Sequence, residues 1–136
     1  MSSNSLPVRV VAGILRRGDT VLLCQRKRGS RYELLWEFPG GKCEAGESDE
    51  QTLHRELFEE LSIVCTGASL LHSQETTYDD GGVFCVSFFL VNSWSGECIN
   101  NVFEQFAWVP VSDISKYDLL SGNTGVVEVL HNSLKR

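Results

Sequence analysis

Residues 41–63 read GKCEAGESDEQTLHRELFEELSI, and this stretch carries the clearest structural signal in the chain. Ser48 and Gln51 have the spacing of a helix capping box, and two acidic residues between them add negative charge where a first helical turn favours it. No Gly or Pro interrupts the dozen residues after the cap. The pattern therefore predicts a helix over residues 49–61.

At 3.6 residues per turn, this helix divides into two neighbouring stripes. The apolar arc, which includes one histidine, comprises Leu53, His54, Leu57, Phe58 and Leu61. The adjacent arc carries three carboxylates, Glu56, Glu59 and Glu60. The segment is expected to bury one face and to present concentrated acid on the next.

Three carboxylates at spacings of three and four residues repel one another, by about 0.2–0.5 kcal/mol per pair. A divalent cation would remove the repulsion, and oxygen ligands suit Mg²⁺ or Mn²⁺ better than zinc. Taken alone, a solvated acidic face is the commoner explanation. Gly40 and Gly41, just before the helix, favour the metal interpretation because glycine lets the backbone approach a ligand closely.

The residues of this stretch match the Nudix box, GX5EX7REUXEEXGU, in which U is a bulky aliphatic residue. The matching positions are Gly41, Glu47, Arg55, Glu56, Leu57, Glu59, Glu60 and Ile63. Ser62 stands where the box has its last glycine, and this departure leaves every metal-binding carboxylate in place. A match of this length is highly specific, so the chain resembles the Nudix hydrolases.

A wider phrase, WEFPGGK at residues 36–42 with Glu44, Gly46 and Glu47, resembles the MutT branch of that family, the 8-oxo-dGTP diphosphatase type. The resemblance covers most of the chain. It implies an α/β fold, the Nudix α/β/α sandwich, with a mixed β-sheet between helices.

The length agrees with one domain over residues 1–136, which the resemblance implies is a single Nudix hydrolase domain, and residues 1–7 are expected to be a flexible N-terminus. The net charge of −6 argues against binding of a nucleic acid polymer or a membrane surface. Five cysteines without a CxxC pair favour free thiols. With no apolar signal-peptide core and no membrane span, the expected location is the cytoplasm.

Apolar and β-branched runs predict strands on both sides of the helix. The expected strands are residues 8–15, 20–25, part of 63–73, 74–78, 83–91 and 106–109. The run VFCVSFFLV at 83–91 is nearly all apolar, which predicts a central strand buried on both faces. The resemblance implies a short helical start at 111–114, and apolar residues at helical spacing predict a closing helix over 124–134.

The resemblance implies hydrolysis of a nucleotide diphosphate linkage with a divalent metal, which is Mg²⁺ with Mn²⁺ as the alternative. The implied metal ligands are Glu56, Glu59, Glu60 and the carbonyl of Gly40. Glu56 is the first choice for the general base, although family members differ on which carboxylate has this role. Arg55 is expected to pair with Glu47 or a neighbouring acid and to hold the helix against the turn.

Four residues are the candidates for substrate binding. Arg26 resembles the family arginine that reaches the phosphates, and its planar guanidinium suits this task. Lys42 either contacts a phosphate or faces solvent, and Phe38 either lines the base pocket or packs in the core. Asn123 stands where MutT-like enzymes place a residue facing the purine, but it fits a turn or helix start equally well.

Other polar residues are weaker candidates. Glu44 and Glu104 are possible outer carboxylates near the metal. His54 is expected to be packed or half-buried, and no metal role is expected for His72 or His131.

The leading functional prediction is a metal-dependent nucleoside triphosphate pyrophosphohydrolase that removes oxidised guanine nucleotides such as 8-oxo-dGTP, a DNA-repair task. One alternative keeps the reaction and changes the base, for example to a cytidine triphosphate. Another is a catalytically silent Nudix domain that binds a nucleotide. The expected partner is a small nucleotide, and the chain is expected to be a monomer or a homodimer.

Overall fold

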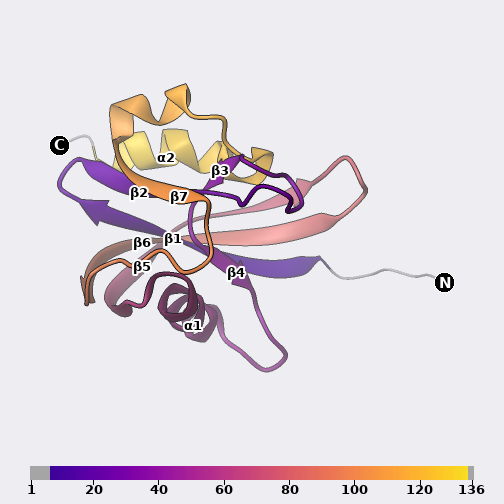
Figure 1. The fold of residues 1–136 in the computed structure, drawn as a ribbon. Coiled ribbons are helices and arrows are strands. Elements are labelled where there is room, and N and C mark those ends of the chain that lie inside the picture. The colour runs from indigo at the N-terminus through magenta and orange to yellow at the C-terminus, as the bar shows by residue number, and fades with distance from the viewer. Residues whose placement is uncertain (1–6, 135–136) are drawn as a thin grey trace.

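The computed structural model describes residues 7–134, so the expected flexible N-terminus lies outside the described residues except for its last member. The strands are β1 (Val8–Arg17), β2 (Thr20–Gln25), β3 (Trp36–Glu37), β4 (Gly40–Lys42), β5 (Val64–Thr77), β6 (Val83–Ser95) and β7 (Gln105–Pro110). The helical segments are α1 (Asp49–Leu61), α2 (Gly125–Ser133) and the 3₁₀ turns η1 (Val111–Lys116) and η2 (Ser121–Asn123). Figure 1 shows how they are arranged.

Strand β1 connects the sheet because its two ends pair with different partners. Along its length it lies parallel to β6 and antiparallel to β4, and β6 pairs antiparallel with β5. Its last residues pair with β2, which also lies antiparallel to β3 and β7. Strand β6 therefore lies between β1 and β5, which confirms the central strand predicted from its apolar sequence.

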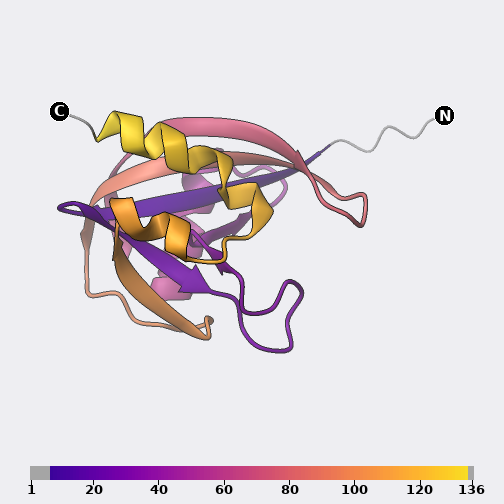
Figure 2. The ribbon, with the colours of Figure 1, turned by 90° about the horizontal axis from the view of Figure 1, so that it is seen from above.

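Buried side chains form two clusters, one on each face of the sheet. One contains the α1 residues Leu53, Leu57 and Leu61, and the other contains the α2 residues Val126 and Leu130. Figure 1 shows α1 below and α2 above the strands, and Figure 2 shows from above that η1 covers the same side as α2. The α/β/α sandwich with a mixed sheet is confirmed.

Helix α1 occupies the predicted residues, and its capping box is formed. The Ser48 hydroxyl accepts from the Gln51 backbone N–H at 3.1 Å, and the Gln51 side chain accepts from the Ser48 N–H at 2.9 Å. These two bonds satisfy donors that a helix start otherwise leaves unpaired.

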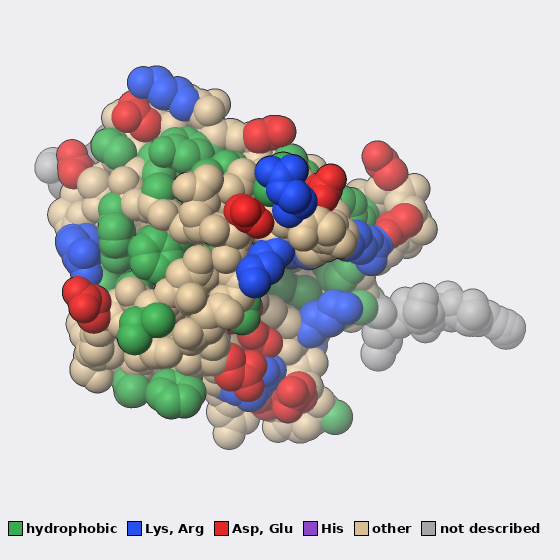
Figure 3. Space-filling model, in the orientation of Figure 1, with side chains coloured by type: hydrophobic (Ala, Val, Ile, Leu, Met, Phe, Trp, Pro, Cys, Tyr) green, Lys and Arg blue, Asp and Glu red, His purple; other side chains and the backbone are tan. Residues whose placement is uncertain are grey.

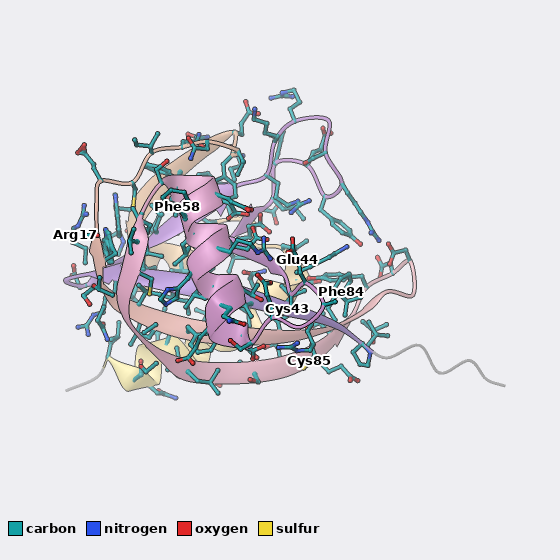
Figure 4. The ribbon with its side chains drawn as sticks, turned by 90° about the horizontal axis from the view of Figure 1, so that it is seen from below. Arg17, Cys43, Glu44, Phe58, Phe84 and Cys85 are labelled. Carbon is teal, nitrogen blue, oxygen red and sulfur yellow. The ribbon has the colours of Figure 1, made fainter. Side chains whose placement is uncertain are left out.

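The buried stripe of α1 is turned further toward the acids than the sequence predicted. Phe58 is 60% exposed on the outer part of the helix (Figure 4), and His54 is also exposed, so the expected core position of both was wrong. Each residue advances 100° around the helix, and Phe58 follows Leu57 on the side away from the carboxylates. Glu56 and Glu60 are instead half-buried beside the leucines.

Several strands differ from the prediction. The two runs expected in 63–78 form the single long strand β5, which contains register shifts, and β6 continues to Ser95 rather than ending near residue 91. The sequence did not predict strands β3 and β4. Backbone pairing to β2 and β1, rather than an apolar pattern, places these two strands in the sheet. The closing helix α2 agrees with its prediction to within one residue at each end.

Two further expectations concern the cysteines and membrane-spanning helices. All five cysteines are free. Within residues 7–134, no helix is both long and apolar enough to cross a membrane.

Ser62 ends α1 in the left-handed conformation (φ 60°, ψ 32°), a geometry that favours the glycine of the box. Asn101 stabilises this end. Its Nδ2 donates to Ser62 Oγ at 2.9 Å and to the Glu59 carbonyl at 3.1 Å, while its backbone N–H donates to the Glu60 carbonyl at 3.1 Å. The segment after β6 therefore caps the last turn of α1.

We predict that Asn101→Ala lowers the free energy of unfolding by about 1 kcal/mol, because the Glu59 carbonyl and the Ser62 hydroxyl at the end of α1 lose their donor. Urea denaturation measures the change. Asn92→Ala is the control, because Asn92 is exposed on β6. Equal stability of the two variants would contradict the capping role.

Candidate active site

The site begins where α1 lies against β4. Strand β4 pairs with β1, and a Cβ added to Gly40 would lie 1.9 Å from the Val11 carbonyl oxygen. A Cβ added to Gly41 would lie 2.3 Å from a carboxylate oxygen of Glu56, and the Gly40 N–H donates to Glu60 Oε1 at 3.0 Å. Gly40 thus lets β4 lie closely against β1, and Gly41 leaves the space that the Glu56 carboxylate occupies beside β4.

Arg55 holds the acids of the site together. Its guanidinium binds Glu47 through two bonds, of 2.7 Å from Nε and 2.9 Å from Nη2. Nη2 also donates to the Lys42 carbonyl at 3.1 Å, and Nη1 lies 3.0 Å from Glu56 and 3.4 Å from Glu59. The expected contact with Glu47 is present, and through it Arg55 joins the helix to the turn. Figure 3 shows acidic and basic side chains gathered near β4 and α1.

Glu47 is held as a carboxylate. The bonds from Arg55 are the largest cause that lowers its pKa to about 2, and the Glu44 backbone N–H adds to the effect. The same ion pair raises the pKa of the Arg55 guanidinium. The loop between β4 and α1 is therefore fixed by a charged contact at neutral pH.

Glu60 has the opposite environment. Burial is the main cause that raises its pKa to about 9, and the nearby carboxylates of Glu56 and Glu37 raise it further. The bond from the Gly40 N–H opposes this change only in part. Burial also raises the pKa of Glu56, against the effect of Arg55. A positive charge at this position would stabilise both ionised groups.

The three carboxylates of α1 are the type of ligand that a divalent metal prefers. They supply hard oxygen ligands, and burial together with the carboxylates of Glu56 and Glu37 raises the pKa of Glu60, an effect that a nearby cation would oppose. Across residues 7–134, however, no three His, Cys, Asp or Glu side chains are arranged as a metal-binding group. Glu56 and Glu59 contact Arg55 instead, and Glu60 contacts Gly40.

A cavity of about 300 Å³ opens beside this cluster. Glu60, Gly40, Gly41 and Lys42 form one part of its lining. Other parts come from strands β1 and β6, from Tyr78 after β5, from the segment around Arg26 and from the segment before α2. Acid and backbone N–H groups therefore meet a partly open space that can hold part of a ligand.

Arg26 lines the cavity, but its guanidinium is already engaged. Nη1 lies 3.2 and 3.3 Å from the two carboxylate oxygens of Glu37, and Nε donates to the Arg31 carbonyl at 2.7 Å. Glu37 is mostly buried, which raises its pKa, and the charge of Arg26 opposes this. The structure thus places the expected phosphate-binding arginine in an ion pair at the cavity wall.

Phe38 and Asn123 meet across the cavity. Phe38 is 3% exposed and packs edge-to-face with Phe88, so it belongs to the core and to the cavity lining together. Its backbone N–H donates to Asn123 Oδ1 at 3.0 Å. Asn123 is 8% exposed, and its side chain does not cap α2, whose N-cap residue is Thr124. Asn123 therefore does not cap α2, but it lies in the turn η2, so the turn interpretation is formed and the helix-start interpretation is not.

The remaining candidates differ in position. Lys42 is exposed at the edge of the cavity, which leaves both of its interpretations open. Glu44 is exposed beside Arg55 at 3.7 Å. Glu104 accepts from the Arg28 N–H at 3.1 Å and does not line the cavity.

Sequence reasoning missed several residues of the cavity wall. Glu37 follows a tryptophan in a two-residue strand, and its partner Arg26 is eleven positions away, so only the fold shows their contact. Tyr32 and Tyr78 lie on separate loops, and their rings lie 5.3 Å apart at the cavity. Their aromatic character was the only signal, and it does not distinguish a cavity wall from core.

Comparison with known proteins gives a consistent result. The family model described as NUDIX domain matches residues 6–130. An 8-oxo-dGTP diphosphatase of Haemophilus influenzae is 39% identical over 103 residues, or 75% of each chain. The CTP pyrophosphohydrolase of Escherichia coli is 31% identical over 121 residues, or 89% of each chain. A crystal structure of MutT from Bacillus halodurans has a TM-score of 0.77 and 28% identity, covering 91% of this chain and 82% of that one.

We predict that Glu47→Gln destabilises the fold at pH 7 and much less at pH 2.5. The folded-state pKa of about 2 lies below the ordinary value of 4.5, so this carboxylate stabilises the fold above pH 4.5. The contribution is lost as pH falls from 4.5 toward 2. Urea unfolding of wild type and variant at both pH values measures it.

Glu44→Gln is the matched control, because Glu44 is 68% exposed and only its longer contact with Arg55 is lost. An equal effect of Glu47→Gln at both pH values would show that the ion pair with Arg55 is not the cause.

Proposed function

Since the chain belongs to the Nudix family, we propose that it hydrolyses a nucleoside triphosphate to the monophosphate and pyrophosphate, with an oxidised guanine nucleotide such as 8-oxo-dGTP as substrate. The protein is a Nudix hydrolase, with relatives that are nucleoside triphosphate diphosphatases. In this proposal residues 1–136 form one catalytic domain. The enzyme acts in the cytoplasm, where this reaction would prevent oxidised nucleotides from entering DNA.

One observation carries the proposal. The half-buried carboxylates of α1 and the backbone of Gly40 and Gly41 adjoin a cavity that Asn123 lines from another side. A nucleotide has two parts that match this arrangement: a charged polyphosphate and a base with hydrogen-bonding edges. The site can therefore hold the phosphates near the acids while the base occupies the cavity.

The acids have distinct proposed roles. Glu56, Glu59, Glu60 and the Gly40 carbonyl would hold the metal, and the outer carboxylates of Glu44 and Glu104 are weaker candidates. When bound, Mg²⁺ or Mn²⁺ supplies charge neutralisation on the polyphosphate and lowers the pKa of water. Glu56 accepts the proton of the attacking water, and Arg55 orients it through the 3.0 Å contact.

The phosphates would meet two cations at the cavity. Lys42 is exposed there, and Arg26 lies in the wall. For Arg26 to bind a phosphate, it must share or leave its contact with Glu37. Lys42 has no such competition from an ion pair among residues 7–134 and is the more direct candidate.

Asn123 supports recognition of a base that carries a carbonyl oxygen. Its Oδ1 already accepts from the Phe38 N–H, so Nδ2 is the group that remains to bind a ligand. An amide N–H donates to the 6-oxo group of a guanine, whereas the 6-amino group of an adenine is itself a donor. Phe38, buried beside Asn123, fixes the position of this donor.

A cytidine triphosphate is the second candidate, because cytosine also carries a carbonyl oxygen and one relative is a CTP pyrophosphohydrolase. A catalytically silent domain is disfavoured by the complete set of box carboxylates. The proposal leaves monomer and homodimer open.

We predict that wild type with Mg²⁺ converts 8-oxo-dGTP to its monophosphate and pyrophosphate with a higher kcat/KM than dGTP, CTP or dATP. Chromatography of the nucleotide products and a pyrophosphate assay measure both halves of the reaction. A preference for CTP would select the second candidate. Equal kcat/KM across the panel would contradict recognition through Asn123.

Glu56→Gln shows whether this cluster catalyses the reaction. Loss of the carboxylate should lower kcat at least about 100-fold, as expected for removal of a general base, while thermal stability stays near that of wild type. Glu50→Gln is the matched control, because Glu50 is exposed in the first turn of the same helix. A Glu56→Gln enzyme with near-normal kcat would exclude this assignment.

A further inference from the structure

The turn that carries Asn123 is supported by a row of polar side chains on β5. His72, Gln74 and Thr76 alternate along this strand and are half-buried, whereas Ser73 and Glu75 between them are exposed. His72 Nε2 lies 3.0 Å from Gln74 Oε1, and Gln74 Nε2 donates to Thr76 Oγ1 at 3.0 Å. The His72 ring stacks on Phe88 in the core. The row is therefore anchored to the sheet.

Gln74 extends this row to the segment before α2. Its Nε2 also donates to the Gly122 carbonyl at 3.3 Å. Gly122 is the residue directly before Asn123, and both belong to the short turn η2. A side chain from β5 thus holds the backbone of the turn that presents the base-binding amide.

Gln74 and Tyr78 each pack closely against a glycine in or next to the turn. A Cβ added to Gly125 would lie 2.5 Å from Gln74 Oε1, so the first residue of α2, as glycine, leaves the space in which this amide lies. A Cβ added to Gly122 would lie 2.1 Å from the Tyr78 hydroxyl oxygen. The two glycines on either side of Asn123 and Thr124 therefore admit two polar side chains from β5 and the residue that follows it.

Tyr78 completes the support. Its hydroxyl oxygen lies against Gly122, 2.1 Å from where a Cβ on that residue would be, and its ring packs against Tyr32 and Phe84 at the cavity. Gln74 and Tyr78 hold the same residue from two positions on one edge of the sheet. The turn is also held by the bond from the Asn123 N–H to the Leu120 carbonyl, by the bond from the Phe38 N–H to Asn123 Oδ1, and by two bonds from Thr124 to the Ser121 carbonyl.

We propose that Gln74 and Tyr78 are positioning residues for base selection, because together they fix Gly122 and so set the place of Asn123 Nδ2 in the cavity. This inference rests on the proposed function, in which Asn123 binds the base. In the proposed binding mode, neither side chain contacts the phosphate that reacts. Loss of either one lets the turn move, which weakens the bond between Asn123 and the base but leaves the carboxylates of α1 in place.

The proposal makes a specific kinetic prediction. Gln74→Met keeps the length of the side chain and removes its amide, and Tyr78→Phe keeps the ring and removes the hydroxyl. Each variant should raise KM for the preferred nucleotide up to about tenfold, the effect of losing one polar contact that supports the turn, with a smaller change in kcat. The ratio of kcat/KM between the preferred nucleotide and its competitors should fall by a similar factor.

The double variant adds a test of shared action. If both side chains act through Gly122, the double variant loses little more selectivity than either single one. Glu75→Gln is the matched control, because Glu75 lies next to Gln74 on β5 and its side chain is exposed on the other face. It should retain the kcat, KM and selectivity of wild type.

The experiment measures kcat, KM and melting temperature for wild type and the four variants on the panel of nucleoside triphosphates. Should Gln74→Met fail to fold, Tyr78→Phe alone decides. Folded variants that keep wild-type selectivity would overturn the inference while the proposed function stands. Wild type that hydrolyses no nucleotide, and binds no nucleoside monophosphate by calorimetry, would overturn both.

Discussion

The close approach of α1 to β4 is the contact on which the site depends. Gly40 lies against the backbone of β1, where there is no space for a side chain, and Gly41 lies against the flexible carboxylate of Glu56. The Gly40 N–H binds Glu60 at this contact. A short strand without apolar residues is thus fixed between the first strand and an acidic helix, and it brings backbone polar groups and carboxylates to one edge of the cavity.

Arg55 makes such a concentration of acid compatible with a folded helix. It contacts Glu47, Glu56 and Glu59 at 2.7–3.4 Å and so offsets the repulsion among like charges. The carboxylates are nevertheless not equivalent. Glu47 has a pKa near 2 in its bidentate ion pair, whereas burial raises that of Glu60 to about 9. Carboxylates with separated pKa values in one site are typical of catalytic centres.

The sequence was most informative where a property is local. The capping box and the spacing of the acids depend on neighbours along one helix, and both predicted α1 correctly. The position of Phe58 depends on which side of α1 meets the sheet, and the ion pair of Arg26 with Glu37 depends on the pairing of β2 with β3. Such features follow from tertiary contacts, which no periodicity along the chain encodes.

The central claim is that the carboxylate of Glu56 needs the space that Gly41 leaves beside it. Gly41→Ala tests this, with Ala45→Gly in the exposed loop as the control. We expect Gly41→Ala to remain folded, because the flexible carboxylate can move, and to lose at least about tenfold in kcat for nucleoside triphosphate hydrolysis because Glu56 is displaced. A Gly41→Ala enzyme with the kcat of wild type would contradict the account.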